Sequence, residues 1–238
     1  MTALERRVAR GLSGVRRRIT AAGADPSRVT VVAVTKGFGV EAVEAALAAG
    51  LADVGESYAQ ELVAKSASLD QAPVRWHFVG RLQSNKVKAL AGVVDRWQSV
   101  DRPQLVPELE RRAPGARVLV QVNVSGEPHK GGCPPAETSV LVSQLVRSGL
   151  RVDGLMAVGA SGPPEDARPG FRLLSRLADA LELPERSMGM SGDLEVALEE
   201  GATMVRVGRA LFGPRPATRP VPARGPSAGM TTCRCDTK

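Results

Sequence analysis

The stretch VTVVAVTKGFG at residues 29–39 decides how the rest of the chain is interpreted. It runs through apolar or β-branched residues from Val29 to Val34 and then places Thr35 and Lys36 before a glycine. An apolar run without polar alternation is typical of a parallel strand covered on both faces. A lysine at the carboxyl end of such a strand lies where α/β proteins place ligands, so Lys36 is the first candidate functional residue. The alternative is an ordinary exposed lysine.

Length and composition indicate a globular protein. The 238 residues are 43% hydrophobic and 24% charged, which suits one large α/β barrel or two smaller domains. No apolar run approaches the length of about 18 residues that a membrane span requires. The arginine-rich beginning of the chain lacks the apolar core of a signal peptide. We therefore expect a cytoplasmic protein without membrane association.

The cysteine content and the net charge further narrow the class of protein. The odd set of Cys133, Cys233 and Cys235 predicts neither a disulfide framework nor a zinc site, and we interpret the close pair in the C-terminal segment as fortuitous. The formal net charge is +7, but residues 214–238 hold five basic residues against one aspartate. The remaining body is only mildly basic and the chain is poor in aromatic residues, so nucleic-acid binding is not expected.

Strand and helix patterns alternate after an amphipathic helix at residues 3–22. Strand patterns lie at 29–34, 52–55, 75–79, 93–98, 118–124, 152–158, 185–188 and 204–207. Helix patterns lie between them at 40–50, 58–69, 84–91, 104–112, 135–148, 169–181 and 193–200. Such alternation implies parallel strands with right-handed crossovers, and eight strands predict an α/β fold of the (β/α)₈ TIM-barrel type.

An open doubly wound sheet is the alternative architecture. It would usually carry a glycine-rich dinucleotide fingerprint, and neither G-x-G-x-x-G nor a P-loop occurs in the chain. We expect a single barrel domain over residues 1–213, with the N-terminal helix as an added element. Residues 214–238 are rich in Pro, Arg and Gly and are expected to form a disordered tail.

The turns after the last two predicted strands resemble phosphate-binding loops, which barrels place there. In SMGMSGD at 187–193, Ser191 stands where it would cap the next helix. In RVGRALFG at 206–213, Gly208 permits close backbone approach and Arg209 opens a short helix. Each turn alone is a weak signal, but barrel closure would bring both near Lys36. A ligand that carries an aldehyde and a phosphate, such as pyridoxal 5′-phosphate (PLP), fits that arrangement.

Sequence blocks extend this interpretation over nearly the whole chain. They read AVTK at 33–36, GESYAQE at 55–61, WHFVGRLQSNK at 76–86, VLVQVNVSGEPHKGG at 118–132, GLMAVGA at 154–160 and SMGMSGDLEVALEEGATMVRVGRALFG at 187–213. In these blocks the chain resembles the YggS/PROSC family of pyridoxal phosphate homeostasis proteins, which is similar to the N-terminal barrel of alanine racemase. The resemblance implies that PLP is carried as a Schiff base on Lys36.

The resemblance also implies the surroundings of the cofactor. Ser191 and the backbone at Gly208 and Arg209 would hold the phosphate, and Arg206 would face the pyridine nitrogen. A cationic partner does not favour a protonated ring, so the ring would be a weaker electron sink than one opposite a carboxylate. The alternative for Arg206 is a salt bridge at the rim. Further cofactor contacts are implied at Ser57, Met156, Ser187 and Met188.

Some positions depart from the family's usual pattern. Ser57 stands where asparagine is common, which removes a side-chain amide. Arg209 stands where serine or threonine is common, so a guanidinium replaces a hydroxyl near the phosphate. Residues 37–39 lack the proline often found after the lysine, so we expect a looser loop there.

Other polar residues have structural interpretations. We expect His77 to be a packed or hydrogen-bonded structural histidine. Residues 83–86 would form either a polar helix cap or part of a pocket wall. Lys130 and Gly131 lie in a loop that could serve as a lid, and we assign them no catalytic role.

The sequence favours a carrier over a catalyst. Racemisation needs a proton-transfer group on each face of the substrate, and Lys36 supplies one. In the racemase the second comes from a C-terminal domain that we do not expect here, and Tyr58 is not expected to replace it. We therefore predict a monomer that stores, buffers or delivers PLP, with PLP-dependent apoenzymes as candidate partners and no metal. A PLP-dependent racemase or lyase is the alternative, followed by a nucleic-acid or partner-binding module that uses the basic tail.

Overall fold

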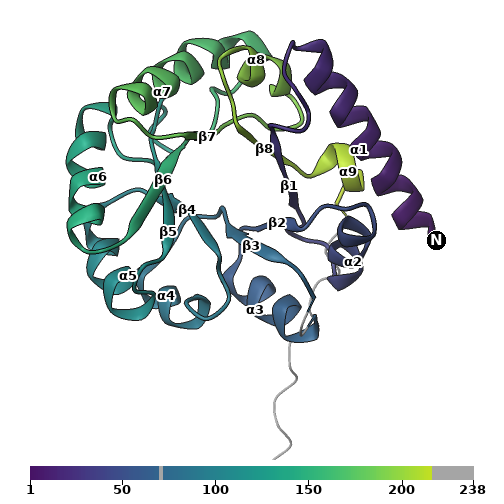
Figure 1. Ribbon diagram of the computed structural model, residues 1–238, viewed down its shortest axis with the longest axis horizontal. Helices are drawn as coiled ribbons and strands as arrows, with labels where there is room; N and C mark the ends of the chain where they lie inside the picture. Colours follow the sequence, from purple (N-terminus) through teal and green to yellow (C-terminus); the bar gives the residue numbers. More distant parts are fainter. Residues whose placement is uncertain (70–71, 216–238) are drawn as a thin grey trace, which may run out of the picture.

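Parallel strands close into an eight-stranded barrel in the computed structural model, which describes residues 1–69 and 72–215 (Figure 1). The strands are β1 Thr30–Val34, β2 Asp53–Glu56, β3 Arg75–Phe78, β4 Arg96–Val100, β5 Arg117–Gln121, β6 Arg151–Met156, β7 Glu185–Ser187 and β8 Met204–Val207. They follow one another around the barrel in sequence order, and β8 pairs with β1. The predicted (β/α)₈ barrel is confirmed.

Helices alternate with the strands and surround the barrel (Figure 1). They are α2 Val40–Ala48, α3 Ala59–Ser68, α4 Ser84–Leu90, α5 Val106–Arg112, α6 Thr138–Arg147, α7 Arg168–Ala180, α8 Leu194–Glu199 and α9 Arg209–Phe212. Single turns of 3₁₀-helix precede α5, α6 and α7, as η1 Pro103–Leu105, η2 Pro135–Glu137 and η3 Pro164–Ala167. Each of these turns begins with a proline, whose fixed φ suits a first helical position.

Two strand boundaries differ from the prediction by three residues, and the others by two at most. The strand expected over 93–98 begins later, as β4, because the N–H groups of Val93 and Val94 both donate to the Leu90 carbonyl and prolong the turn after α4. The strand expected over 118–124 ends earlier, as β5. Neither shift changes the number or the order of the strands.

Apolar side chains form two layers, one on each face of the sheet. The larger layer lies between the strands and the helices, and Trp97, Phe171 and Phe212 are among its largest buried side chains. The smaller layer lies inside the barrel, because successive strand residues point to opposite faces. It consists of Val32, Leu119, Met156 and Met204. Such a small inner layer leaves room in the barrel interior for buried polar side chains.

Helix α1, Ala3–Ala21, packs beside α8 and α9 on the outside of the ring (Figure 1). Thr2 and Glu5 form a capping box at its start. Gly11 allows the close crossing, because a Cβ at this position would collide with the Ala210 carbonyl of α9. The added N-terminal helix is thus confirmed, and it braces the segments that follow β7 and β8.

Two features concern the whole described chain. Among residues 1–69 and 72–215, every helix falls short of the length and apolarity that a membrane crossing requires. The same residues contain no group of His, Cys, Asp and Glu side chains arranged to hold a metal ion. Of the disordered tail expected over residues 214–238, residues 216–238, with Cys233 and Cys235, lie outside the described residues.

Candidate functional site

A cavity of about 900 Å³ opens at the carboxyl ends of the strands. The wall is formed by residues from β1, β6, β8 and α9, from the turns that follow β1, β2, β3, β6, β7 and β8, and from the segment after α9. The structure brings seven of the expected site residues together on this wall: Lys36, Ser57, Met156, Ser191, Arg206, Gly208 and Arg209. Residues distant in sequence therefore meet in one place large enough for a cofactor-sized ligand.

Lys36 stands in a turn that the neighbouring elements hold firmly. The Thr35 N–H donates to the Gly55 carbonyl of β2 at 3.0 Å. The Gly37 N–H donates to the Glu61 carboxylate of α3 at 2.9 Å. Gly37 has a φ of 76°, in the left-handed region that only glycine adopts freely. The glycine is thus needed to turn the chain sharply just after Lys36.

A buried ion pair lies beneath this turn. The Lys65 ammonium of α3 pairs with Glu56 and also donates to the Thr35 carbonyl at 2.9 Å. The Thr35 hydroxyl donates to Glu56 at 2.7 Å. Burial raises the pKa of Glu56, while the hydrogen bonds from Lys65 and Thr35 oppose that change. The backbone on either side of Lys36 is therefore fixed by groups that do not belong to the cavity.

The surroundings of Lys36 favour its neutral amine. Burial lowers the pKa of Lys36, and the positive charges of Arg215 and Arg206 lower it further, while Glu56 acts in the opposite direction. A lower pKa increases the fraction of amine that carries a free lone pair at neutral pH. Lys36 is consequently suited to attack a carbonyl carbon.

Arg206 is buried at the base of the cavity, with 5% of its surface exposed. Its guanidinium donates to the carbonyl and the hydroxyl of Ser187 and to the carbonyl of Ala157, each at 2.7 Å. These acceptors are all neutral, so the rim salt bridge considered for Arg206 is not among its contacts in the described chain. Burial lowers the pKa of Arg206 to about 10, which leaves the guanidinium charged at neutral pH.

Ser187 and Met188 do not line the cavity, in contrast to the expectation. Both are fully buried. The Ser187 hydroxyl lies between Arg206 and Gln98, so it supports the wall from behind. Met188 packs in the outer apolar layer because successive residues leaving β7 point to opposite faces of the sheet.

Ser191 does not cap α8 as the sequence suggested. The helix begins after Asp193, whose carboxylate accepts a hydrogen bond from the Met190 N–H at 2.6 Å. The Ser191 hydroxyl instead accepts from the Ala210 N–H of α9 at 3.3 Å. This contact ties the turn after β7 to the turn after β8 at the same part of the cavity.

Helix α1 reaches the same turn through Arg18. Its guanidinium donates to the Ser191 carbonyl at 3.0 Å and to both carboxylate oxygens of Glu195 at 2.5 and 2.6 Å. The added helix therefore fixes the position of the turn after β7. No motif marks Arg18, which looks in the sequence like any solvated arginine of an amphipathic helix.

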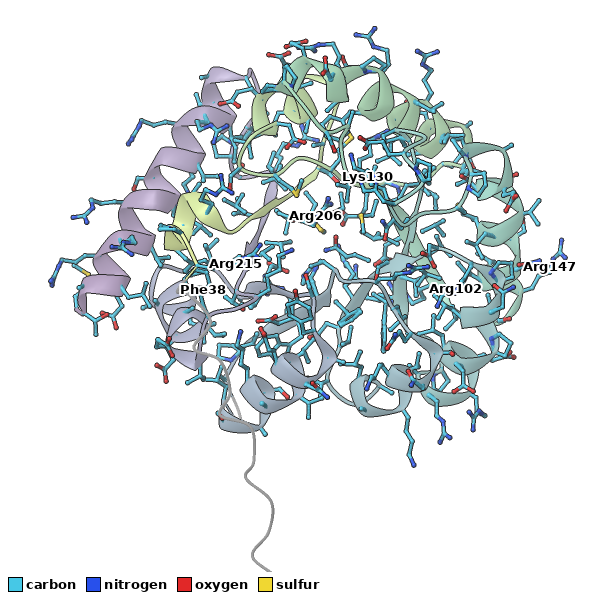
Figure 2. The ribbon with its side chains drawn as sticks, turned by 180° about the vertical axis from the view of Figure 1, so that it is seen from behind. Phe38, Arg102, Lys130, Arg147, Arg206 and Arg215 are labelled. Atoms are coloured by element: carbon cyan, nitrogen blue, oxygen red, sulfur yellow. The ribbon has the colours of Figure 1, made fainter. Side chains whose placement is uncertain are left out.

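The wall also contains residues that the sequence did not single out: Val34, Phe38, Val79, Val158, Met190, Gly192, Gly213, Pro214 and Arg215. Pro214 and Arg215 matter most, because residues 214–238 were expected to form a tail outside the barrel. Figure 2 shows Arg215 beside Phe38 at the rim and Arg206 near the barrel centre. Composition alone could not reveal this return of the chain to the cavity.

The remaining polar candidates lie away from the cavity. His77 is buried, and its ring nitrogens contact Asp53 and Gln98, which confirms its structural interpretation. Residues 83–86 begin α4 and are not on the wall. Lys130 donates to the Gly159 carbonyl at 2.6 Å, and Tyr58 is largely exposed. None of these residues contributes to the cavity wall as described.

A family model for the N-terminal domain of alanine racemase matches residues 15–216. The chain belongs to the alanine racemase N-terminal domain family. This match covers the strands and helices of the barrel and ends just after the last described residue that lines the cavity.

Several relatives that are similar over most of the chain carry informative names. The "pyridoxal phosphate homeostasis protein" of Pseudomonas aeruginosa is 41% identical over 223 residues, which cover 90% of this chain and 97% of the relative. The protein of the same name from Aquifex aeolicus is 39% identical over 227 residues, covering 90% and 99%. The structure of PipY from Synechococcus elongatus with PLP bound has a TM-score of 0.75 and 31% identity, covering 87% of this chain and all of PipY. The resemblance drawn from the sequence blocks is thus confirmed.

Proposed function

We propose that this protein binds PLP and acts in its homeostasis, by storing, buffering or delivering the cofactor. The observation that carries the proposal is the cavity itself, where Lys36 shares one wall with Arg206 and the turns after β7 and β8. The names of the relatives from Pseudomonas aeruginosa and Aquifex aeolicus, and the PLP bound to PipY, support the same function.

The donor set of the cavity suits PLP. A phosphate would meet the hydroxyl of Ser191 and the backbone and guanidinium at Gly208 and Arg209. The side chains of Val34 and Met156 would supply apolar contacts to the pyridine ring. The wall contains no Asp or Glu in the described chain, so an anionic ligand would meet no like charge there.

Each polar residue has a defined task in this proposal. Lys36 would hold the cofactor through its amine, which can condense with an aldehyde to a Schiff base with release of one water. Arg206 would donate toward the ring nitrogen and oppose protonation there. When bound, PLP supplies an electrophilic carbon and an electron sink. A cation at the ring nitrogen weakens that sink, which favours carriage over catalysis.

The cavity wall also favours a carrier because of what surrounds Lys36. In residues 1–69 and 72–215, the wall includes no carboxylate, histidine or tyrosine that could act on the opposite face of a substrate. We further propose that the protein is a cytoplasmic monomer and that PLP-dependent apoenzymes receive the cofactor, without nucleic acid or membrane as partners.

Reduction with borohydride tests the proposal directly. Protein incubated with PLP should show a new absorbance band, and borohydride should remove the band and attach a pyridoxyl group to the peptide that contains Lys36. Lys36→Ala should show neither effect, whereas Lys88→Ala, at an exposed lysine on α4, should behave as wild type. An unchanged band in Lys36→Ala would refute the assignment.

A second experiment separates carrier from catalyst. Loaded protein is mixed with small L-amino acids in deuterated water, and α-proton exchange is followed by NMR. It is mixed separately with a PLP-requiring apoenzyme. We expect activation of the apoenzyme and α-proton exchange no faster than with free PLP. Exchange that is much faster than with free PLP and is lost in Lys36→Ala would favour a racemase or lyase.

A further inference from the structure

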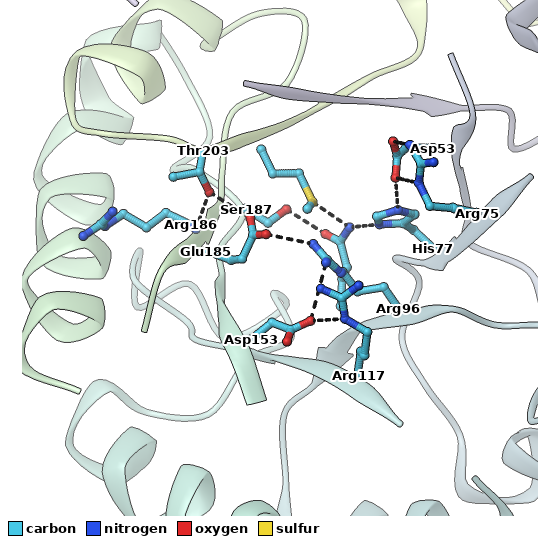
Figure 3. A network of polar contacts seen from close by, with 12 residues as sticks. Asp53, Arg75, His77, Arg96, Arg117, Asp153, Glu185, Arg186, Ser187 and Thr203 are labelled. Atoms are coloured by element: carbon cyan, nitrogen blue, oxygen red, sulfur yellow. Dashed lines mark hydrogen bonds and ion pairs between the residues drawn. The ribbon is translucent and has the colours of Figure 1, made fainter. Parts of the chain in front are cut away.

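A line of polar side chains, all buried except the partly exposed Asp53, crosses the barrel interior from the amino end of the sheet to the cavity. Figure 3 shows its part from Asp53 to Ser187. Barrel interiors are usually filled by branched apolar residues, so a continuous polar line needs an explanation. Its members, in order from the cavity, are Arg206, Ser187, Gln98, His77 and Asp53.

The two ends fix the direction of every hydrogen bond in this line. Arg206 can only donate, so the Ser187 hydroxyl oxygen accepts from it at 2.7 Å. The single Ser187 proton then goes to Gln98 Oε1 at 2.6 Å. This places the Gln98 amide nitrogen on the other side, where it meets His77 Nδ1 at 2.6 Å and Met204 Sδ at 3.1 Å. If the Gln98 amide were turned around, its nitrogen would compete with the Arg206 guanidinium as a donor to Ser187. Its oxygen would then face the Met204 thioether, which has no hydrogen to donate.

The line ends at a carboxylate. With His77 Nδ1 accepting from Gln98, the ring carries its proton on Nε2, which lies 2.9 Å from Asp53 Oδ1. Burial raises the pKa of Asp53, but hydrogen bonds from His77 and Arg75 outweigh burial and hold the pKa below its usual range. All donors therefore point from Arg206 toward an ionised Asp53 on the far side of the interior.

We propose that Gln98 is a positioning residue for Arg206, and through it for the bound cofactor. By accepting the Ser187 proton, Gln98 keeps the lone pairs of that hydroxyl turned toward the guanidinium. Arg206 is then held by three acceptors, and its orientation toward the ring nitrogen is set before the ligand enters. The identity of the ligand in this inference rests on the proposed function.

Loss of Gln98 would change Arg206 without touching the cavity wall. The Ser187 hydroxyl proton would have no acceptor in the line and could turn toward the guanidinium. The guanidinium has only N–H donors and cannot accept that proton. Arg206 would lose one of its acceptors and reorient more freely. Its hydrogen bond to the ring nitrogen would weaken, and the nitrogen would become easier to protonate.

The test uses ring-¹⁵N-labelled PLP bound to the full chain and observed by NMR. In Gln98→Leu we expect the ring-nitrogen signal at neutral pH to move toward the protonated value and the Kd for PLP to rise about tenfold. Ser187→Ala, a smaller change in packing, should move the signal in the same direction.

The matched control is Ser99→Ala on the same strand. Ser99 is buried, and its hydroxyl has no hydrogen-bond partner among the described residues, so its removal disturbs β4 without breaking the line. An unchanged nitrogen signal in both folded Gln98→Leu and Ser187→Ala, or an equal shift in Ser99→Ala, would overturn the inference.

A measurement without PLP separates this inference from the proposed function. In the ligand-free protein, the guanidinium N–H groups of Arg206 should exchange with solvent about tenfold faster in Gln98→Leu than in wild type or Ser99→Ala. This result is expected whether or not PLP is the natural ligand. Equal exchange rates would refute the positioning role even if PLP binds, while failure of wild type to bind PLP would refute only the proposed function.

Discussion

Basic side chains have different neighbours at the two ends of the barrel interior. At the amino ends of the strands, Arg75, Arg96 and Arg117 each pair with a carboxylate (Figure 3). The clearest case is Arg96, which lies between Glu185 at 3.2 Å and Asp153 at 3.5 Å. At the carboxyl ends, the cavity wall carries basic residues without a carboxylate in the described chain: Lys36, Arg206, Arg209 and Arg215.

This difference indicates what each end is for. Charges removed from water are stable when they are paired, and the amino-end cluster satisfies that condition within the chain. At the cavity, Arg206 is buried among neutral acceptors only. Its charge is the kind that an anionic or electron-rich ligand can compensate. We therefore interpret the amino end as the part that holds the barrel together and the carboxyl end as the part reserved for a ligand.

The largest expected effect comes from breaking the ion pairs at the amino ends of the strands, which we call the paired end. Arg96→Met should lower the free energy of unfolding by about 2–4 kcal/mol, because the partly buried Glu185 loses its cation while Asp153 keeps only Arg117. The midpoint of urea denaturation measures the change. The affinity for PLP should remain that of wild type.

Arg206→Met is the matched variant at the other end. It removes a buried cation whose partners are neutral, so stability should be kept or raised while PLP binding weakens at least tenfold. If Arg206→Met destabilises the barrel as much as Arg96→Met does, the proposed division between the two ends is wrong.

An intermediate effect concerns acid stability at the paired end. The folded-state pKa of Asp53 is lowered, so its ionised form contributes stability above the unfolded pKa of about 3.9, and that contribution is lost as pH falls below it. Asp53→Asn should therefore be less stable than wild type at neutral pH by about 1–2 kcal/mol. The difference in unfolding free energy between wild type and Asp53→Asn should shrink between pH 5 and pH 2, by about 1–2 kcal/mol. Denaturation series at fixed pH measure this change. A gap that stays constant with pH would contradict this origin.

The sequence predicted the barrel well because its evidence was local and repeated. Apolar strands alternating with amphipathic helices require the same crossover each time, so small boundary shifts such as that at β4 left the topology unchanged. Lys36 was also predictable, because a polar residue ending an apolar strand is brought to the ligand-binding edge by any α/β arrangement.

The paired end could not be predicted in the same way. Asp53, His77 and Gln98 come from three strands and look in the sequence like unrelated polar residues. Their contacts depend on how the strands are staggered when the barrel closes, which no local pattern encodes. The contact of the Ser187 side chain with Gln98, away from the cavity, could not be predicted for the same reason.

Arg215 illustrates a different limit and offers the smallest of the expected effects. Proline- and arginine-rich composition suggested a tail, yet Arg215 lines the cavity and its side chain lies next to Gly37. Arg215→Gln should raise the Kd for PLP three- to tenfold, consistent with the loss of roughly one exposed charge contact. Because Arg215 lowers the pKa of Lys36, the substitution should also raise that pKa and slow capture of PLP at neutral pH, with less slowing at higher pH. Arg147→Gln, on the far side of the barrel in Figure 2, removes the same charge and is the control. Equal losses in both variants would mean that Arg215 acts only through net charge.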